Sequence, residues 1–222
     1  MKIQVFTDFD GTITERDTLV HLLDKYVGGN WYEIEDRVDD GSLSEEQGLR
    51  QEIALLTAPF EEALASVLDE VPVDSGFSEF AAYCESKGWP LSILSGGLKP
   101  LIAAVMEAQG LSHLPLYAND LTFEDDGRWR VIPATTPRIN KLCNHCKSWW
   151  LAESLDPVIY IGDGTTDRCP GARADLLFAK GSLADWCERE KVAHVRWEKF
   201  EEILAWLSGL RGEAWLDTLT AP

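Results

Sequence analysis

The chain has 222 residues, which is enough for one sizeable hydrophobic core or for one core with a smaller insert. With 45% hydrophobic and 26% charged residues it has the composition of a globular protein, and no apolar run is long enough to span a bilayer. The net charge of −18 disfavours nucleic acid as a partner, because the phosphate backbone would be repelled. The amino terminus enters a strand directly, without a basic-then-apolar leader, which predicts a cytoplasmic protein with no membrane partner.

The first predicted strand ends abruptly in two acidic residues. Asp8 and Asp10 follow the apolar segment Val5–Thr7 and precede Gly11. Side chains at positions i and i+2 of an extended segment point the same way, so both carboxylates can project from the carboxyl end of the strand. Two carboxylates this close repel unless a cation or a proton lies between them. The segment predicts a site for a hard cation such as Mg²⁺, although an acidic turn that merely closes a strand is the alternative.

Residues 15–76 form a segment with helical apolar spacing and no convincing strand. The pair Ser44 and Gln47 predicts a capping box, and Pro59 suits a first helical turn. Four helices are predicted, at residues 17–26, 31–38, 44–56 and 59–71. We expect this segment to form a small helical domain that is inserted after the first strand.

After residue 76, predicted strands and helices alternate. Helices are predicted at residues 76–87, 100–109, 140–155, 183–191 and 200–210, and strands at 91–94, 158–161, 176–179 and 194–196. Residues 116–133 read as a β-hairpin. Strands separated by helices of this length predict an α/β fold, with a doubly wound, Rossmann-like parallel sheet and helices on both faces. The core is then formed by residues 1–14 and 77–222.

Further polar residues follow later predicted strands. One strand leads into Ser95 and Gly96, which can hydrogen-bond a phosphate oxygen through the hydroxyl and backbone N–H groups. Another leads into Asp163, with Asp167 four residues further on. Lys147, in a helical pattern, can supply positive charge for a transferring phosphoryl group. Ligands of open α/β sheets bind at the carboxyl ends of strands, so we expect these groups to converge.

Taken in order, these motifs resemble those of a known family. Asp8-x-Asp10-Gly11-Thr12, Ser95, Lys147 and Gly162-Asp163-x3-Asp167 are similar to the four motifs of the haloacid dehalogenase superfamily, whose members are mostly Mg²⁺-dependent phosphatases. The resemblance covers nearly the whole chain and leaves only the last dozen residues uninformative. It implies the phosphoserine-phosphatase-like branch, which has a helical cap at residues 15–76.

Within that branch, the sequence is similar to the 2-hydroxy-3-keto-5-methylthiopentenyl-1-phosphate phosphatases. The likeness lies in Asp17, the Ser95-Gly96-Gly97 segment and the Ala174–Lys180 segment. A cysteine pair, Cys143 and Cys146, also resembles one in that subgroup and in the related phosphoethanolamine and phosphocholine phosphatases. The pair can also be half of a zinc site, a redox pair or incidental.

The resemblance implies roles for the strand-end residues. Asp8 is the expected nucleophile, which forms an aspartyl-phosphate, and Asp10 the expected general acid and base. Lys147 completes the catalytic group by neutralising the phosphate and Asp8. The residues expected to hold Mg²⁺ are Asp8, the backbone carbonyl of Asp10, Asp163 and, directly or through water, Asp167. Those expected to contact the substrate are Thr12, Asp17, Ser95 and Gly96.

The expected substrate is a small-molecule phosphate monoester, and the methylthiopentenyl phosphate is one candidate. Phosphoserine, phosphoethanolamine, phosphocholine and sugar phosphates are alternatives, as are a phosphotransferase of the same fold and an inactive binding protein. Asp17, where phosphoserine phosphatases typically have Glu, argues against phosphoserine. Further cap residues could select the leaving group, namely His21, Trp31, Tyr32, Arg37 and Arg50. Tryptophans 197, 206 and 215 suggest an apolar carboxyl-terminal surface, and with it a homodimer.

Overall fold

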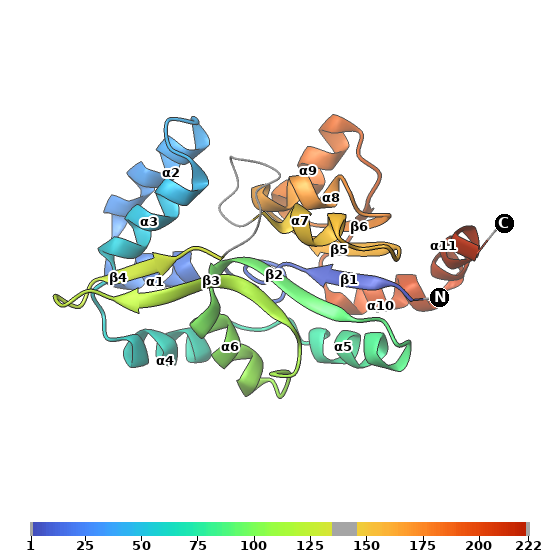
Figure 1. Ribbon diagram of the computed structural model, residues 1–222, viewed down its shortest axis with the longest axis horizontal. Helices are drawn as coiled ribbons and strands as arrows, with labels where there is room; N and C mark the ends of the chain where they lie inside the picture. The colour runs from blue at the N-terminus through green and yellow to red at the C-terminus, as the bar shows by residue number, and fades with distance from the viewer. Residues whose placement is uncertain (1, 135–145, 221–222) are drawn as a thin grey trace.

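A seven-stranded sheet forms the centre of the molecule in the computed structural model, which describes residues 2–134 and 146–220 (Figure 1). The strands run in the order β4-β3-β2-β1-β5-β6-β7, and every pair is parallel except β3 and β4. Their bounds are β1 Gln4–Thr7, β2 Leu91–Leu98, β3 Leu116–Phe123, β4 Trp129–Ile132, β5 Val158–Gly162, β6 Leu176–Ala179 and β7 Val195–Arg196. This confirms the predicted α/β fold with a doubly wound, Rossmann-like sheet.

Helices cover both faces of this sheet. In Figure 1, α4, α5 and α6 lie below the strands, and α7, α8 and α9 lie above β5 and β6. The helices are α1 Thr18–Tyr26, η1 Gly29–Trp31, α2 Tyr32–Asp39, α3 Glu45–Leu55, α4 Phe60–Glu70, α5 Phe77–Ser86, α6 Lys99–Ala108, α7 Lys147–Ala152, η2 Thr165–Asp167, α8 Arg168–Gly171, α9 Gly181–Glu190, α10 Phe200–Ser208 and α11 Leu210–Thr220. In the described part of the chain, no helix has the length and apolar character needed to cross a membrane.

The core divides into two hydrophobic clusters, because successive side chains of a strand point to opposite faces. Val5 and Ile159 belong to the cluster that packs with α5, α6 and α10. Phe6 and Tyr160, one residue further along each strand, belong to the cluster that packs with α7 and α9. All four side chains are almost fully buried. The central strands are therefore apolar on both faces, as a sheet covered on both sides requires.

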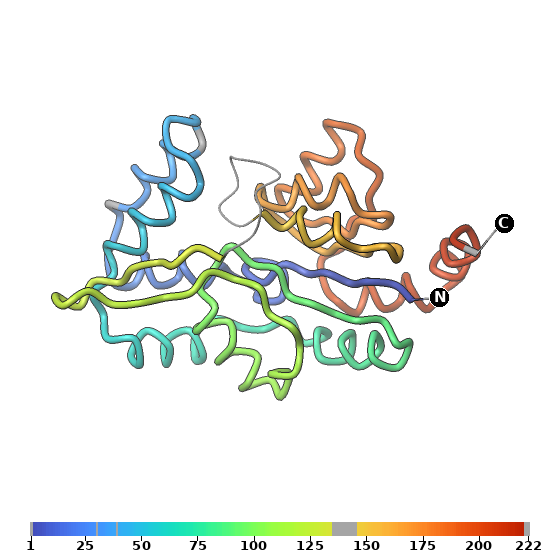
Figure 2. Tube along the Cα trace, viewed as in Figure 1, coloured from blue at the N-terminus to red at the C-terminus, as the bar shows by residue number. Residues whose placement is uncertain are grey.

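The segment of residues 15–76 leaves and rejoins the sheet at neighbouring points. Thr14 and Val73 form an antiparallel bridge, and Asp74 N–H donates to Ile13 O at 2.9 Å. Figure 2 follows the trace from the blue first strand through the blue and cyan helices and back to the sheet. The division into a core of residues 1–14 and 77–222 and a helical cap of residues 15–76 stays a prediction.

Local sequence signals explain how two of these helices begin. The carboxylate of Asp17 accepts hydrogen bonds from the N–H groups of Leu19 and Val20 and so caps α1. The predicted capping box of Ser44 and Gln47 is confirmed at the start of α3.

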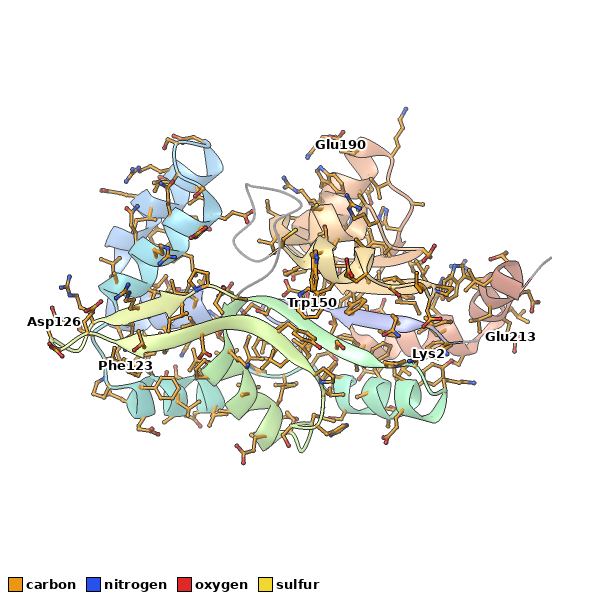
Figure 3. The ribbon with its side chains drawn as sticks, viewed as in Figure 1. Lys2, Phe123, Asp126, Trp150, Glu190 and Glu213 are labelled. Carbon is orange, nitrogen blue, oxygen red and sulfur yellow. The ribbon has the colours of Figure 1, made fainter. Side chains whose placement is uncertain are left out.

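The hairpin of β3 and β4 reaches beyond the rest of the sheet and contacts the predicted cap. Its tip carries Phe123 and Asp126, which lie at the far left in Figure 3. The Trp129 indole donates to Ala58 O at 2.8 Å, and its ring packs against Phe60 at 5.7 Å between centroids. The predicted hairpin is confirmed, and its outer strand supports the connection between α3 and α4.

Three features of the fold differ from the prediction. The strand expected at residues 91–94 continues to Leu98, with a register shift against β3 that accommodates the Ser95-Gly96-Gly97 segment. The carboxyl-terminal stretch that gave no prediction is helical in its described part and forms α11, which starts after Gly209 and ends at Thr220. Trp197 is 1% exposed, because it packs on Phe200 inside the core, and so cannot contribute to a surface. Residues 135–145, which include part of the predicted 140–155 helix and Cys143, lie outside the described residues.

Candidate active site

The site lies where the order of strands reverses direction. After β1 the chain builds outward through β2 and β3, and it then crosses to the other side of β1 to form β5, β6 and β7. Ligands of open α/β sheets bind at this switch point, outside the carboxyl ends of the strands. Asp8 directly follows β1 and donates its N–H to Ile161 O of β5 at 2.9 Å, and Asp163 directly follows β5. Two predicted site residues are thereby placed at the switch point.

Lys147 joins two of the acidic residues at the base of the site. Its ammonium lies 2.8 Å from Asp8 Oδ2 and 2.7 Å from Asp167 Oδ1. Lys147 is 2% exposed and occupies the first turn of α7, which lies over β5 in Figure 1. Although burial alone would lower the pKa of Lys147, the carboxylates of Asp167 and Asp8 raise it. Lys147 is therefore a fixed positive charge.

Asp167 is held by four hydrogen bonds. Its Oδ1 accepts from Lys147 and from the Tyr160 hydroxyl at 2.6 Å, and its Oδ2 accepts from the N–H groups of Asp163 and Gly164 at 3.0 and 3.1 Å. Burial opposes its ionised form, but Lys147 and these donors hold the pKa of Asp167 below its usual range. A carboxylate has about four acceptor positions, so all of those on Asp167 are occupied.

Three carboxylates form a candidate metal cluster. Oxygen atoms of Asp8, Asp163 and Asp167 all lie within 4.8 Å of one another. With Lys147 among them, the group carries two uncompensated negative charges when all members are ionised, which one divalent cation would balance. Burial, followed by repulsion from Asp167, raises the pKa of Asp8 well above its usual value and that of Asp163 to about 6. Carboxylate oxygens are the donors that Mg²⁺ prefers, and so the residues fit this ion.

The turn after β1 packs closely against the Asp163 side chain. The Thr12 hydroxyl donates to Asp163 Oδ1 at 2.6 Å, and Thr12 is fully buried. Gly11 has φ +72°, and a Cβ at that position would lie 2.5 Å from Asp163 Oδ2. Glycine is thus required here both for the backbone conformation and for the close approach. Thr12 contacts Asp163 and is not among the described residues that line the cavity below, and its predicted contact with the substrate stays a prediction.

Asp10 is held by the first residue of α1. Its Oδ1 accepts hydrogen bonds from the N–H and hydroxyl groups of Thr18, at 2.8 and 2.7 Å. Its Oδ2 lies 3.5 Å from the Ser95 hydroxyl, and a Cβ on Gly97 would lie 2.5 Å from that oxygen. Burial raises the pKa of Asp10 above its usual value, with the Thr18 bonds opposing the rise. A raised pKa suits a carboxyl group that gives and takes a proton.

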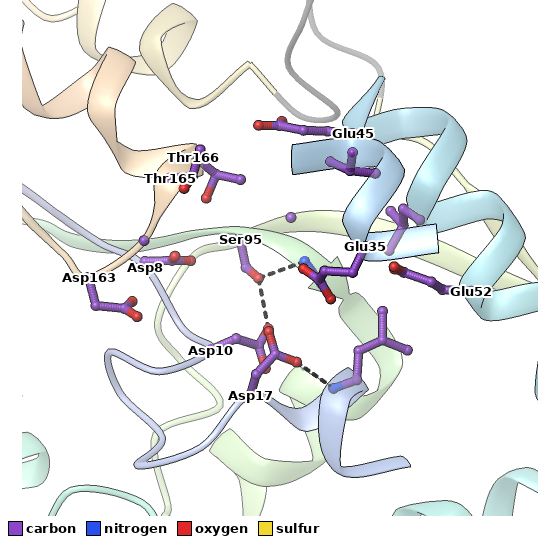
Figure 4. Close-up of a pocket in the computed structure, with 16 residues that line it drawn as sticks. Asp8, Asp10, Asp17, Glu35, Glu45, Glu52, Ser95, Asp163, Thr165 and Thr166 are labelled. Carbon is purple, nitrogen blue, oxygen red and sulfur yellow. Dashed lines mark hydrogen bonds between the residues drawn. The ribbon is translucent and has the colours of Figure 1, made fainter. Parts of the chain in front are cut away.

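A cavity of about 360 Å³ opens over these residues (Figure 4). Ser95 and Gly96 line it on the β2 side, and Asn119 of β3 supports them by donating to Gly96 O at 2.6 Å. Its core-side lining consists of Asp8, Asp10, Ser95, Gly96, Gly97, Asp163, Gly164, Thr165 and Thr166. The cavity therefore gives a ligand access to the predicted nucleophile, acid and phosphate-binding groups together.

The opposite wall of the cavity is acidic. Asp17, Glu35, Glu45 and Glu52 line it, and Figure 4 shows their side chains around the open space. Among the described lining residues there is no lysine or arginine. Burial and, to a lesser extent, Glu35 raise the pKa of Glu52 to about 7, and burial and Asp10 raise that of Asp17 to about 8. Asp17 thus lies where it was predicted to lie, facing the site.

The other predicted cap residues lie away from the described lining of the cavity. His21 is buried, and its Nε2 lies 2.8 Å from the Ser66 hydroxyl. Arg50 pairs with Glu46 at 3.1 Å. Trp31 and Tyr32 both donate to Asp24, and Arg37 is exposed. Cys146 is a buried free cysteine directly before Lys147, and its predicted partner Cys143 lies outside the described residues.

Several residues around the site were not predicted from the sequence: Thr18, Asn119, Tyr160, Lys180 and the three glutamates of the acidic wall. A signal existed for α3, because Glu45, Leu49 and Glu52 have the spacing of one helix face. For Thr18 and Asn119 there was no comparable signal, since single hydroxyl and amide residues are common on surfaces.

Comparison with known proteins places the chain in a family. A family model described as haloacid dehalogenase-like hydrolase matches residues 5–169. A 2-hydroxy-3-keto-5-methylthiopentenyl-1-phosphate phosphatase from Exiguobacterium sp. is 30% identical over 215 residues, which are 95% of this chain and 99% of the relative. Pdp3-interacting factor 1 from Schizosaccharomyces pombe is 31% identical over 217 residues, which are 91% of this chain and 93% of that protein.

A solved structure has the same fold. The phospho-aspartyl intermediate analogue of a phosphoserine phosphatase superposes with a TM-score of 0.70 and 22% identity, and the match covers 92% of this chain and 98% of that one. The chain belongs to the haloacid dehalogenase-like hydrolase family. Within that family it is a phosphoric monoester hydrolase, as its similarity to the phosphatases among its relatives and structural neighbours indicates.

Proposed function

We propose that the protein is a Mg²⁺-dependent phosphatase that hydrolyses a small-molecule phosphate monoester through an aspartyl-phosphate on Asp8. The observation that supports this most strongly is the convergence of three carboxylates and one lysine beneath an open cavity. Oxygen atoms of Asp8, Asp163 and Asp167 lie within 4.8 Å of one another, and the Lys147 ammonium contacts both Asp8 and Asp167. A divalent cation and a phosphate group can both be accommodated there.

Asp8 and Asp163 are the residues that would hold Mg²⁺, together with the backbone carbonyl of Asp10. Asp167 has its acceptor positions filled, so we assign it to orient Lys147 and the backbone after β5 rather than to bind the metal directly. When bound, Mg²⁺ would neutralise part of the negative charge on the phosphoryl oxygens and on Asp8.

Hydrolysis proceeds in two steps on the residues of this chain. A carboxylate oxygen of Asp8 attacks phosphorus in line, the bond to the leaving oxygen breaks, and the carboxyl group of Asp10 protonates the departing alkoxide. Asp10 then removes a proton from water, which attacks the same phosphorus and releases phosphate and the free Asp8 carboxylate. Lys147 and the Ser95–Gly96 segment stabilise the charge on the equatorial oxygens in both steps.

Thr18 sets the position of Asp10, which gives a specific prediction. Thr18→Val removes one hydrogen bond to the Asp10 carboxylate and keeps the side-chain shape. A bond to a charged group contributes about 2 kcal/mol, so we expect kcat to fall by about 30-fold. Since Thr18 does not line the described cavity, KM should stay nearly unchanged. Steady-state kinetics of Thr18→Val beside Thr18→Ser, which keeps the hydroxyl, measures this; equal loss of kcat in both variants would contradict it.

The first substrate to test is 2-hydroxy-3-keto-5-methylthiopentenyl-1-phosphate, the compound in the name of the Exiguobacterium relative. The acidic wall of the cavity supports a leaving group without negative charge, because Glu35, and Glu52 above its pKa of about 7, would repel a carboxylate. Phosphoserine is therefore a poor candidate. A panel of phosphate monoesters assayed with Mg²⁺ tests the proposal: we expect turnover of the uncharged ester to exceed that of phosphoserine. Failure to hydrolyse any member would overturn the proposed function.

Ionisation of Glu52 should make binding depend on pH. With a pKa of about 7, Glu52 is mostly neutral near pH 6 and mostly ionised near pH 8. The added charge at the cavity wall should weaken binding of a phosphate ester by about 1 kcal/mol, or about fivefold in KM. The ratio of the KM of the unmodified protein to that of Glu52→Gln should therefore rise between these pH values. Glu46→Gln, on the same helix but outside the described lining, is the control, and a constant ratio would contradict the assignment.

A further inference from the structure

Lys180 extends from the end of β6 to the turn that follows β1. Its ammonium donates to Thr12 O at 3.3 Å and lies 4.3 Å from the centre of the Trp197 ring. Lys180 does not line the described part of the cavity, so it does not contact the substrate. Building on the proposed function, we propose that Lys180 is a positioning residue for the metal site, which holds the Gly11–Thr12 turn so that Thr12 fixes the Asp163 carboxylate for Mg²⁺.

The contacts of Lys180 reach both segments that determine where Asp163 lies. The Lys180 backbone N–H donates to Gly162 O at 3.1 Å, and three residues later the Leu183 N–H donates to Asp163 O at 2.8 Å. The backbone of Asp163 is thus tied to the start of α9. The Lys180 side chain ties the turn after β1 to the same place, although Thr12 is 168 residues away in the sequence.

The Gly11–Thr12 turn determines the position of the Asp163 carboxylate. Thr12 binds one of its oxygens at 2.6 Å, and Gly11 packs closely against the other. Both oxygens of the carboxylate therefore lie against this turn, and a shift of the turn would move or rotate the carboxylate. Residues that orient metal ligands through hydrogen bonds typically change metal affinity by about 10- to 100-fold when they are replaced.

The Trp197 ring supports the Lys180 side chain in this position. Trp197 is 1% exposed and cannot move away, and an ammonium over the face of an aromatic ring is attracted by its quadrupole. Asp163 and Asp74 also attract the ammonium. A lysine that only adds charge to the surface typically has no fixed partners. Lys180 instead contacts both the buried Trp197 ring and the backbone oxygen of Thr12.

Binding of Mg²⁺ to the protein without substrate tests the inference by isothermal titration calorimetry. Lys180→Met keeps the alkyl chain over Trp197 but removes the donor and the charge, and we expect it to weaken Mg²⁺ binding about 10-fold. With saturating Mg²⁺, kcat should stay within about threefold of the original, because Asp8 and Asp10 are unchanged. Lys180→Arg retains a donor and a charge and should recover most of the affinity.

Two further variants separate this role from a general effect on charge or folding. Thr12→Val removes the hydrogen bond to Asp163. The loss of Mg²⁺ affinity that it causes should not add to the loss caused by Lys180→Met in the double variant, because both changes act on the same chain of contacts from Lys180 through Thr12 to Asp163. Lys199→Met removes an equal charge two residues after Trp197, from a lysine that pairs with Glu15, and should bind Mg²⁺ as the original does. If Lys180→Met does not fold, the Mg²⁺ affinities of Thr12→Val and Lys180→Arg still test the contacts from Lys180 through Thr12 to Asp163.

The outcomes distinguish this inference from the proposed function. Original Mg²⁺ affinity in Lys180→Met or Thr12→Val, or additive losses in the double variant, would overturn the positioning role alone. Absence of Mg²⁺ binding to the unmodified protein would overturn the proposed function and this inference together.

Discussion

Asp8→Asn is expected to abolish turnover while the protein stays folded. An amide is not a nucleophile toward phosphorus, so kcat with Mg²⁺ should fall by about 10⁴-fold or more. The substitution keeps the shape of a side chain that is 6% exposed. It also removes a buried carboxylate whose ionisation is opposed by burial and by Asp167, and Lys147 keeps Asp167 as an ion-pair partner. The melting temperature should therefore equal or exceed that of the original protein. Kinetics and thermal unfolding measure the two effects.

The matched control for Asp8→Asn is Asp120→Asn, which makes the same chemical change on the exposed side of β3. It should leave kcat unchanged. Borohydride added during turnover should convert the aspartyl-phosphate of the original protein to homoserine at position 8, detectable by peptide mass spectrometry. Substantial turnover by Asp8→Asn, or homoserine at another aspartate, would remove Asp8 from the role of nucleophile.

Lys147→Met is expected to reduce both activity and stability. The ammonium neutralises Asp8 and Asp167 at 2.8 and 2.7 Å, and its loss leaves two buried carboxylates without their common partner. Breaking a buried ion pair on one side costs about 3–5 kcal/mol of folding free energy. Loss of a charge that stabilises the transferring phosphoryl group should lower kcat by about 10³-fold. Denaturant unfolding and kinetics at saturating Mg²⁺ measure the two losses.

Lys87→Met, which removes an exposed lysine after α5, is the control for this change in charge and should affect neither quantity. Added Mg²⁺ should recover part of the stability of Lys147→Met, because the cation can compensate the same carboxylates. A stable and active Lys147→Met protein would show that the buried lysine has no part in catalysis.

The positions of the main site residues could be predicted because they depend on short-range rules. Asp8, Ser95 and Asp163 each follow an apolar, β-branched segment, and the carboxyl ends of parallel strands meet at one edge of the sheet. The strands that precede Asp8 and Asp163 are neighbours at the switch point, although the alternation of strands and helices predicts only a parallel sheet and not the order of its strands.

The contacts that hold the site residues in place could not be predicted, because they join segments that are far apart in the sequence. Lys180 and Thr12 are 168 residues apart, and Thr12 and Asp163 are 151 residues apart. Hydrophobic periodicity predicts which face of a strand is buried, but it does not predict which side chains from distant segments come into contact. Thr18 illustrates the same limit, since nothing in the sequence at the start of α1 indicated its contact with Asp10.

The acidic wall of the cavity was missed for a related reason. Its glutamates come from α2 and α3, and each helix alone shows a polar face that solvent would also explain. Only the packing of α3 against β4 places one of these faces over the strand ends. The proposed selection of substrate by the acidic wall therefore depends on how the helices of residues 15–76 are oriented. Local sequence patterns do not predict that orientation.

The central claim is that Mg²⁺ and the phosphoryl group bind side by side at Asp8. A crystal structure of the protein with Mg²⁺ and beryllium trifluoride, a mimic of a phosphoryl group on aspartate, tests this claim most directly. We expect beryllium on an Asp8 oxygen, Mg²⁺ at about 2.1 Å from oxygens of Asp8 and Asp163, and fluorine atoms beside Lys147 and Ser95. Beryllium on any other carboxylate, or a metal ion bound away from Asp8, would contradict the account.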